Sequence, residues 1–112
     1  MKPEEQRIAI AQACGWKPDD DGDGTGWKGS WIHQRLIGMK PTFRNGKVVS
    51  YLIEQTVPDY LNDLNAMHEA EKFVKNVWGK YVKTLNSFTD PACATAAQRA
   101  EAFLRTLNLY TL

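Results

Sequence analysis

The stretch VPDYLNDLNAMHEAEKFVKNVWGKYVKTL, residues 57–85, contains the longest helical pattern in the chain. At 3.6 residues per turn, its apolar side chains fall on one face and its charged and amide side chains on the other. The apolar face comprises Leu64, Met67, Ala70, Val74, Val77, Trp78, Tyr81, Val82 and Leu85. The pattern predicts a central helix that covers one face of a sheet.

Two starts are compatible with this helix. Thr56 and Asp59 fit a capping box, while Asp63 is a good N-cap after the preceding turn, and we prefer Asp63. Gly79 costs about 1 kcal/mol relative to alanine inside a helix. We therefore expect any division of the central helix to fall at Gly79.

Length and composition predict one globular domain, residues 1–112. The chain has 112 residues, of which 43% are hydrophobic and 24% charged, and its formal net charge is +1. These values exclude a disordered chain and a globally polybasic protein. The charge is uneven, however, because residues 27–53 contain five basic side chains and no acidic one. The five are Lys28, Arg35, Lys40, Arg44 and Lys47.

The two cysteines and the apolar runs indicate a cytoplasmic protein without membrane association. Cys14 and Cys93 lie far apart and fit neither a paired metal or redox motif nor a disulfide framework, so we expect two buried thiols. No apolar run approaches the roughly 20 residues that span a bilayer, and no signal-peptide pattern follows the first residues.

Three antiparallel strands are predicted in the first half of the chain. A run of β-formers within residues 27–37 favours one strand, which Gly38 would end. The Asn45-Gly46 pair is a strong hairpin signal, because both turn positions need positive φ. It joins strands that we place at residues 39–44 and 47–54.

Helices are predicted at both ends of the chain as well. Residues 3–14 follow a proline at a helix start and stop at Gly15. Thr95 and Gln98 form a capping box ahead of an apolar stripe, and Asn108 is suited to a left-handed end. The whole pattern predicts an α+β fold with N-terminal, central and C-terminal helices.

Three blocks of sequence resemble small phage and prophage proteins: ACGW (13–16), PDYLNDLNAMHEAEK (58–72) and ATAAQRAEAFLRTL (94–107). They are similar to the phage ABA sandwich domain group, whose name describes α/β/α layering. The acidic insert after the first block and residues 73–88 depart from the group's pattern. The resemblance implies an α/β/α sandwich of phage or prophage origin, and it transfers no catalytic residue to this chain.

Residues 17–26 form a polar, glycine-rich and aspartate-rich stretch that predicts a flexible loop. Within it, Asp19, Asp21 and Asp23 match the start of a calcium-binding loop, where alternate carboxylates wrap a hard cation. The twelfth position of that loop is Ser30, where a bidentate glutamate is needed. A solvated acidic loop is therefore preferred, and Ca²⁺ binding stays an alternative.

His68 and Glu71 are the two polar residues of the central helix that its amphipathic pattern leaves unexplained. They are three positions apart, so both could reach one metal ion, as in helical bundles that combine two such motifs. This chain contains only one, and a histidine at the border of an apolar face more often bonds to a neighbouring loop.

The basic segment is the best candidate surface, and it comprises Lys28, Trp31, Arg35, Lys40, Arg44 and Lys47. Basic and aromatic side chains in alternation suit either a protein partner or single-stranded nucleic acid. No nucleophile with a base and no phosphate-binding glycine loop is found. Without such motifs we expect a non-enzymatic protein, and the resemblance to phage proteins implies that it acts in the host bacterial cytoplasm and binds a host or phage protein. The alternatives are a nucleic-acid-binding module and a divalent-metal protein.

Overall fold

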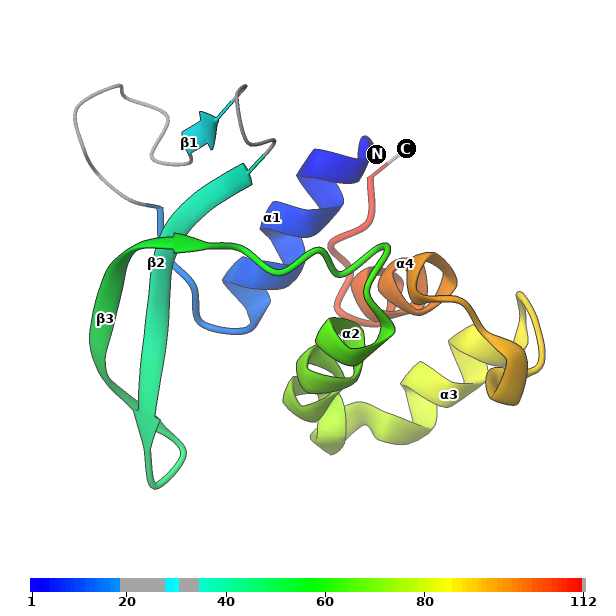
Figure 1. Cartoon of the computed structure of the whole chain (residues 1–112). Coiled ribbons are helices and arrows are strands. Elements are labelled where there is room, and N and C mark those ends of the chain that lie inside the picture. The colour runs from blue at the N-terminus through cyan, green and yellow to red at the C-terminus, as the bar shows by residue number, and fades with distance from the viewer. Residues whose placement is uncertain (19–27, 31–34, 112) are drawn as a thin grey trace. The chain divides into compact units, whose positions relative to one another are not determined.

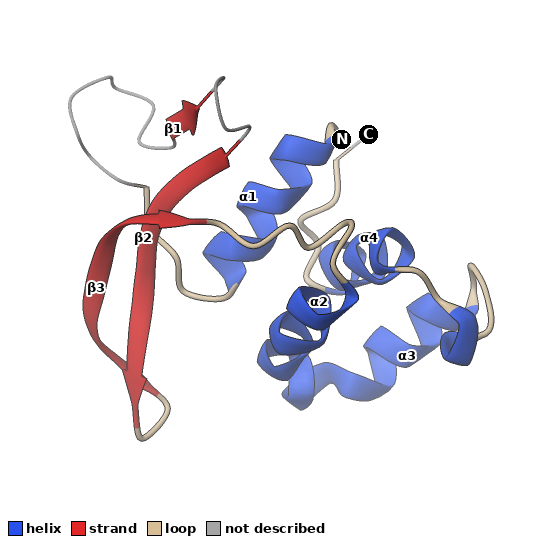
Figure 2. Ribbon diagram, in the orientation of Figure 1, coloured by secondary structure: helices blue, strands red, loops and turns tan. Residues whose placement is uncertain are grey.

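A computed structural model describes residues 1–18, 28–30 and 35–111. The fold is α+β, with three antiparallel strands and helices in the N-terminal, central and C-terminal parts, which confirms the predicted class (Figures 1 and 2). The chain divides into two compact units. The hairpin unit is Ala11–Val57, and the helical unit combines Met1–Ile10 with Pro58–Leu112.

The hairpin unit contains one antiparallel sheet in the order β1-β2-β3. Its strands are β1 (Lys28–Ser30), β2 (Arg35–Arg44) and β3 (Lys47–Thr56). The turn between β2 and β3 has positive φ at both central residues, 54° at Asn45 and 77° at Gly46. The predicted Asn-Gly hairpin is therefore confirmed, because these angles are what its tight turn requires.

The prediction that Gly38 ends a strand is wrong. β2 runs through Gly38, which is buried, and the pairing with β3 shifts by one position between Gly38 and Lys40. The extra residue of this shift lies on β3, so β2 itself continues through Gly38 without an inserted residue. The strand predicted within 27–37 is thus the short β1 and the beginning of β2.

Backbone hydrogen bonds at Lys17 join the segment after the first helix to the sheet. Helix α1 (Pro3–Ala13) stops before Gly15, whose φ of 94° gives the predicted left-handed end. Trp16 is buried, and its N–H donates to the Ala11 carbonyl at 2.9 Å. Lys17 and Met39 exchange two backbone hydrogen bonds of 3.2 and 2.9 Å. Lys17, the first residue of the predicted flexible loop 17–26, thus pairs with β2, and residues 19–26 of that predicted loop lie outside the described residues.

The helical unit contains the remaining helices. They are α2 (Leu64–Glu71), the 3-10 helix η1 (Lys72–Val77), α3 (Trp78–Asn86), the short 3-10 helix η2 (Pro91–Cys93) and α4 (Ala96–Thr106). Helix α4 packs against both α2 and α3. None of the helices in the described ranges has the length and apolar character needed to cross a lipid bilayer.

The central helix begins where predicted but breaks elsewhere. The Asp63 carboxylate accepts hydrogen bonds from the backbone N–H groups of Asn65 and Ala66 at 3.0 and 3.3 Å, so Asp63 is the N-cap. The break is η1, in which Val74 has non-helical angles of φ −113° and ψ 19°. Gly79 lies in the first turn of α3 instead. Val74 is fully buried, so its packing overrides the local preference for a continuous α-helix.

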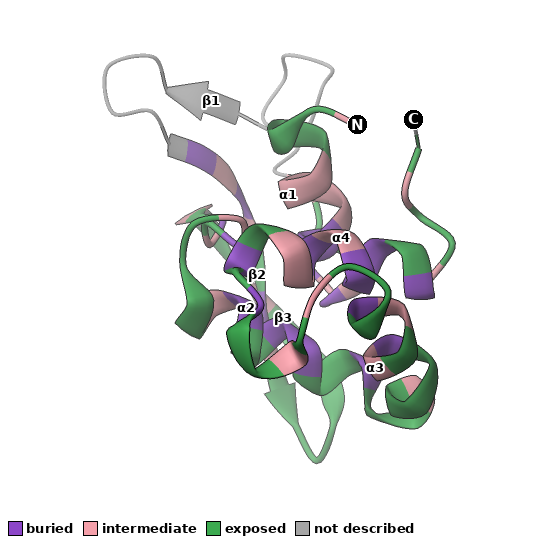
Figure 3. Ribbon diagram, turned by 90° about the vertical axis from the view of Figure 1, so that its right-hand side faces the viewer, coloured by how far each residue is buried: buried purple, intermediate pink, exposed green. Residues whose placement is uncertain are grey.

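The break changes which side chains of the central helix reach the core. Met67, Val74, Tyr81 and Leu85 are buried, as are Ala100, Phe103 and Leu104 of α4 (Figure 3). Trp78, however, is 45% exposed. A single helical wheel places it on the apolar face, because the wheel assumes one unbroken helix. The wheel also places Leu64 there, but Leu64 is 43% exposed at the first position of α2, ahead of the break.

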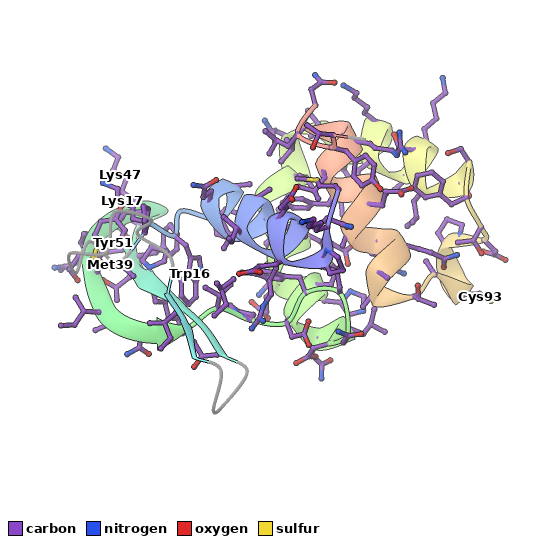
Figure 4. All side chains as sticks on the ribbon, turned by 90° about the horizontal axis from the view of Figure 1, so that it is seen from above. Trp16, Lys17, Met39, Lys47, Tyr51 and Cys93 are labelled. Carbon is purple, nitrogen blue, oxygen red and sulfur yellow. The ribbon has the colours of Figure 1, made fainter. Side chains whose placement is uncertain are left out.

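The C-terminal helix follows its sequence pattern closely. The Thr95 hydroxyl accepts from the Gln98 N–H at 3.2 Å, and the Gln98 side chain accepts from the Thr95 N–H at 2.9 Å. Asn108 has the left-handed φ of 58° that was expected. Cys14 is buried as predicted, whereas Cys93 is exposed on η2 (Figure 4). The expectation of two buried thiols is wrong for Cys93, because the one-turn η2 has no buried side chain.

Candidate functional site

Three of the predicted basic side chains lie together on the β2–β3 hairpin. Lys40 and Arg44 are exposed and share one face of β2, because side chains two or four positions apart on a strand point the same way. Lys47 pairs directly with Arg44 and is exposed on that same face. Leu52, 47% exposed, pairs with Lys40. This basic face therefore combines three cationic side chains with an aliphatic one.

The other members of the predicted surface are only partly placed. Lys28 and Arg35 belong to β1 and β2, which pair through Ser30 and Arg35, but their side chains are not among those described. Trp31 lies outside the described residues, and so do the predicted metal ligands Asp19, Asp21 and Asp23.

Aromatic rings on the opposite face of the hairpin are already in contact with other groups. The Lys17 ammonium lies 4.9 Å from the centre of the Tyr51 ring, and both residues are labelled together in Figure 4. A Cβ built on Gly15 would lie 3.4 Å from Phe43 Cζ and 3.4 Å from Pro41 Cγ. The chain after α1 therefore packs on this face, and Tyr51 has one ring face occupied by a cation.

Strand β3 carries four exposed aliphatic side chains. They occupy both faces of the strand, because Leu52 pairs with Lys40 on the basic face and Val48 pairs with Phe43 on the opposite face. Val48, Val49, Leu52 and Ile53 are 38%, 59%, 47% and 64% exposed. We call these four residues the β3 aliphatic patch. β3 is an edge strand, and no other described strand pairs with its outer side.

Two bulges lie within this patch. Between the pairs Thr42↔Ser50 and Phe43↔Val48, β3 contains one more residue than β2, namely Val49. A second extra residue lies between Leu52 and Gln55, next to Ile53. Bulges redirect side chains and interrupt the regular spacing of backbone N–H and C=O groups on an edge. The two most exposed aliphatic residues of the strand thus coincide with its irregular positions.

In the helical unit, His68 and Glu71 meet each other and a third residue, Arg99 of α4. His68 Nδ1 lies 2.9 Å from Glu71 Oε1, and Arg99 Nη1 lies 3.1 Å from Glu71 Oε2. The Glu71 side chain is 6% exposed and that of Arg99 is 15% exposed. Arg99 also donates to the Pro91 carbonyl at 2.7 Å and so fixes η2. This buried ion pair joins α2 to α4, two helices that are far apart in sequence.

The same contacts answer the question of a metal ion at His68 and Glu71. The Glu71 carboxylate is satisfied by Arg99 and His68, so it is not free to bind a cation. Among residues 1–18, 28–30 and 35–111, no group of three or more His, Cys, Asp or Glu side chains is arranged to hold a metal. The cluster is an ion pair with a histidine attached, and its Nδ1 contact leaves the other ring nitrogen, Nε2, for an outside partner.

Tyr81 of α3 completes this cluster from the core side. Its ring is fully buried, and its hydroxyl has no hydrogen-bond partner of normal geometry in the described part of the chain. Burial, followed by the negative charge of Glu71, raises the pKa of the Tyr81 phenol well above its usual value of 10. The hydroxyl therefore stays protonated at all ordinary pH values.

This pKa shift predicts a loss of stability at high pH that depends on Tyr81. The phenol is harder to ionise in the folded chain than in the unfolded one. The contribution of Tyr81 to the free energy of unfolding is therefore complete below about pH 10 and declines as the pH rises further. Between pH 8 and 11, the free energy of unfolding of the native protein should fall by about 1 kcal/mol more than that of Tyr81→Phe. Chemical denaturation at both pH values measures this, and an equal fall in the two proteins would contradict the shift.

A groove opens beside the cluster, at the junction of α2, η1 and α3. Its volume is about 450 Å³, and it is lined by His68, Glu71, Lys72, Lys75 and Trp78. The sequence pattern identified His68 and Glu71 but missed Lys75, Trp78 and Arg99. A helical wheel of one unbroken helix assigns Lys72 and Trp78 to opposite faces, whereas in the structure both line this groove.

Comparison with known proteins adds no functional assignment. The chain matches no protein-family model, and no curated protein and no solved structure matches it significantly.

Proposed function

We propose that this chain is a non-enzymatic interaction protein, encoded by a phage or prophage and acting in the host bacterial cytoplasm, that binds a host or phage protein through β3. The proposal of phage origin rests on the resemblance of the three sequence blocks. The proposal of protein binding rests on one observation, the β3 aliphatic patch. Four exposed aliphatic side chains on one ten-residue strand are the kind of surface that marks a protein contact.

The bulges favour contact through side chains over addition of a strand. A partner strand would need a regular outer edge on β3, and the irregular positions at Val49 and next to Ile53 interrupt that edge. The exposed aliphatic groups can instead enter an apolar hollow on a partner. Full burial contributes about 1.5–3 kcal/mol for each Val, Leu or Ile side chain.

The charges beside the patch indicate the chemistry of the partner. Lys40, Arg44 and Lys47 are exposed on the face that also presents Leu52. Carboxylates around the partner's apolar hollow would complement these cations, steer the association and discriminate against basic surfaces. The proposed partner is therefore a protein surface with an apolar centre and an acidic border.

Nucleic acid fits this surface less well than a protein does. Stacking of bases needs open aromatic faces, but Tyr51 lies under Lys17, and the most exposed apolar side chains of β3 are the aliphatic Val49, Leu52 and Ile53. Three cations on one face nevertheless suit phosphates, so nucleic-acid binding is the alternative outcome that the experiment has to separate.

Affinity purification from the bacterial host tests the proposal with matched variants. The tagged native chain and Leu64→Ser, which changes a 43% exposed residue of α2, should recover one stoichiometric protein after nuclease treatment. Leu52→Ser/Ile53→Ser should lower the recovered protein's affinity more than tenfold, because two aliphatic contacts of about 1.5–3 kcal/mol each are removed. Carbodiimide cross-linking should join Lys40 or Lys47 to an Asp or Glu of that protein.

Three outcomes would overturn the proposal. One is that no stoichiometric protein is recovered, or that the serine variant recovers it equally well. Another is that the native chain binds oligonucleotides with a strong dependence on salt and loses the protein after nuclease treatment, which would favour nucleic acid. The third is a concentration-dependent dimer in sedimentation that the serine variant abolishes, which would make a second copy the occupant of β3.

A further inference from the structure

The groove beside the His68–Glu71–Arg99 cluster is a second candidate site, and it lies wholly within the helical unit. We infer that it binds a small anion that carries a planar aromatic ring, of the nucleoside monophosphate class. This inference is independent of the proposed protein contact on β3.

The break in the central helix lies within the segment that lines the groove. Lys72 and Lys75 belong to η1, and Trp78 is the first residue of α3. Residues three positions apart are neighbours on one side of a helix, and Val74, between the two lysines, has the non-helical angles of the break. Two cations and an aromatic ring therefore line one groove.

Both cations are available to an anion in the groove. Lys75 forms no ion pair with any residue in the described part of the chain. Lys72 lies 2.9 Å from Glu69, but the two side chains are 59% and 72% exposed. An exposed pair of this kind is weak and exchanges readily for a better partner. Glu71, the one carboxylate of the lining, is paired with Arg99, so the groove is cationic on balance.

His68 and Trp78 add a fixed imidazole ring and an exposed indole ring to the two lysines of the groove. Because Glu71 bonds to His68 Nδ1 at 2.9 Å, the ring is held in place while half of its side chain stays exposed. Trp78 is 45% exposed, and its ring centre lies 5.1 Å from that of Tyr81 at an angle of 33°. Tyr81 supports one part of the indole from the core, which leaves the exposed part for stacking with a planar ligand.

The size and the spacing of groups suit a mononucleotide. Pockets for small molecules and cofactors commonly measure roughly 300–1,000 Å³, and this groove has about 450 Å³. A phosphate monoester would contact Lys72 and Lys75, and its base would stack on Trp78. A longer nucleic acid could present the same chemistry at a 5′-phosphate end, so the experiment must compare the two.

Adenosine monophosphate is the probe, with adenosine, inorganic phosphate and a 5′-phosphorylated tetranucleotide as comparisons. Titrations of the full chain are followed by calorimetry and by the NMR signal of the Trp78 indole N–H, which Trp78→Phe identifies. Adenosine monophosphate should bind with a dissociation constant on the order of 0.1–1 mM and shift that signal. Adenosine and phosphate should each bind at least about fivefold more weakly, since each lacks one of the two contacts.

Variants locate the binding in the groove. Lys75→Gln and Trp78→Leu should each weaken adenosine monophosphate binding at least about fivefold, while Trp78→Phe, which keeps a ring, should recover most of the affinity. Lys83→Gln, an exposed lysine of α3 that does not line the groove, should leave it unchanged. Thermal unfolding of each variant confirms that the fold is intact.

The inference is overturned if adenosine monophosphate shows no saturable binding up to 10 mM, or if Lys75→Gln and Trp78→Leu bind it as the native chain does. Equal affinity for inorganic phosphate would remove the role of the ring and would also overturn it. Tighter binding of the tetranucleotide through the same two residues would assign the groove to nucleic-acid ends in place of free nucleotides.

Discussion

Replacing Glu71 by alanine is expected to lower the free energy of unfolding by about 3–5 kcal/mol. The substitution leaves the Arg99 guanidinium buried, with its side chain 15% exposed and without its carboxylate partner. Desolvating an unpaired charge is costly, and the loss also weakens the link between α2 and α4. Urea denaturation of the two proteins measures the difference.

Two comparisons distinguish the loss of this buried ion pair from the loss of a charge on the surface. Glu101 pairs with Arg105 at 3.3 Å, but their side chains are 30% and 42% exposed, so Glu101→Ala should cost at most about 1 kcal/mol. The double variant Glu71→Ala/Arg99→Ala should be less destabilised than the sum of the two single variants, because it leaves no uncompensated charge. Strict additivity would show that the two residues do not interact.

The second large effect is expected at Phe103, in the middle of α4. This side chain is fully buried, and α4 packs against both α2 and α3. Phe103→Ala should lower the free energy of unfolding by about 3–5 kcal/mol, because it removes a large apolar contact and leaves a cavity.

Phe73 provides the matched comparison, since its side chain is 42% exposed. Phe73→Ala should cost about 1 kcal/mol or less. Thermal or urea unfolding of both variants, followed by far-UV circular dichroism, gives the two values. Similar losses for Phe73 and Phe103 would mean that α4 does not form the centre of the core.

Features that depend on neighbouring residues were predictable from the sequence. The Asn45-Gly46 turn, the Asp63 N-cap and the Thr95 capping box all appear where the sequence places them. Each is a bond or backbone angle within a few residues, so its free energy is fixed by the local sequence. The α+β class followed from these markers together with the apolar periodicity.

Features that depend on packing could not be predicted from the sequence. Gly38 and Gly79 were expected to interrupt their elements, but β2 continues through Gly38 and the helix breaks at Val74. A glycine only makes irregular backbone inexpensive, whereas the buried contacts of a residue such as Val74 decide where the irregularity falls. The loss of phase after Val74 then exposes Trp78.

The candidate sites also combine features that the sequence predicts with features that only the structure shows. The interval between His68 and Glu71 was visible in the sequence, but their partner Arg99 is 28 positions beyond Glu71 and carries no local signal. The basic residues of the hairpin were identified from composition. Their alignment on one face with Leu52 required the register of β2 with β3.

The sequence by itself determined the α+β class of this protein, the helix caps at Asp63 and Thr95, the hairpin turn and the basic character of the hairpin, since each depends mainly on interactions over a few residues. Only the tertiary structure decided that Glu71 is buried against Arg99, that β3 bulges at Val49, and that Lys72, Lys75 and Trp78 line one groove. These features arise from contacts between distant segments, whose free energies outweigh the local preferences of the residues that form them.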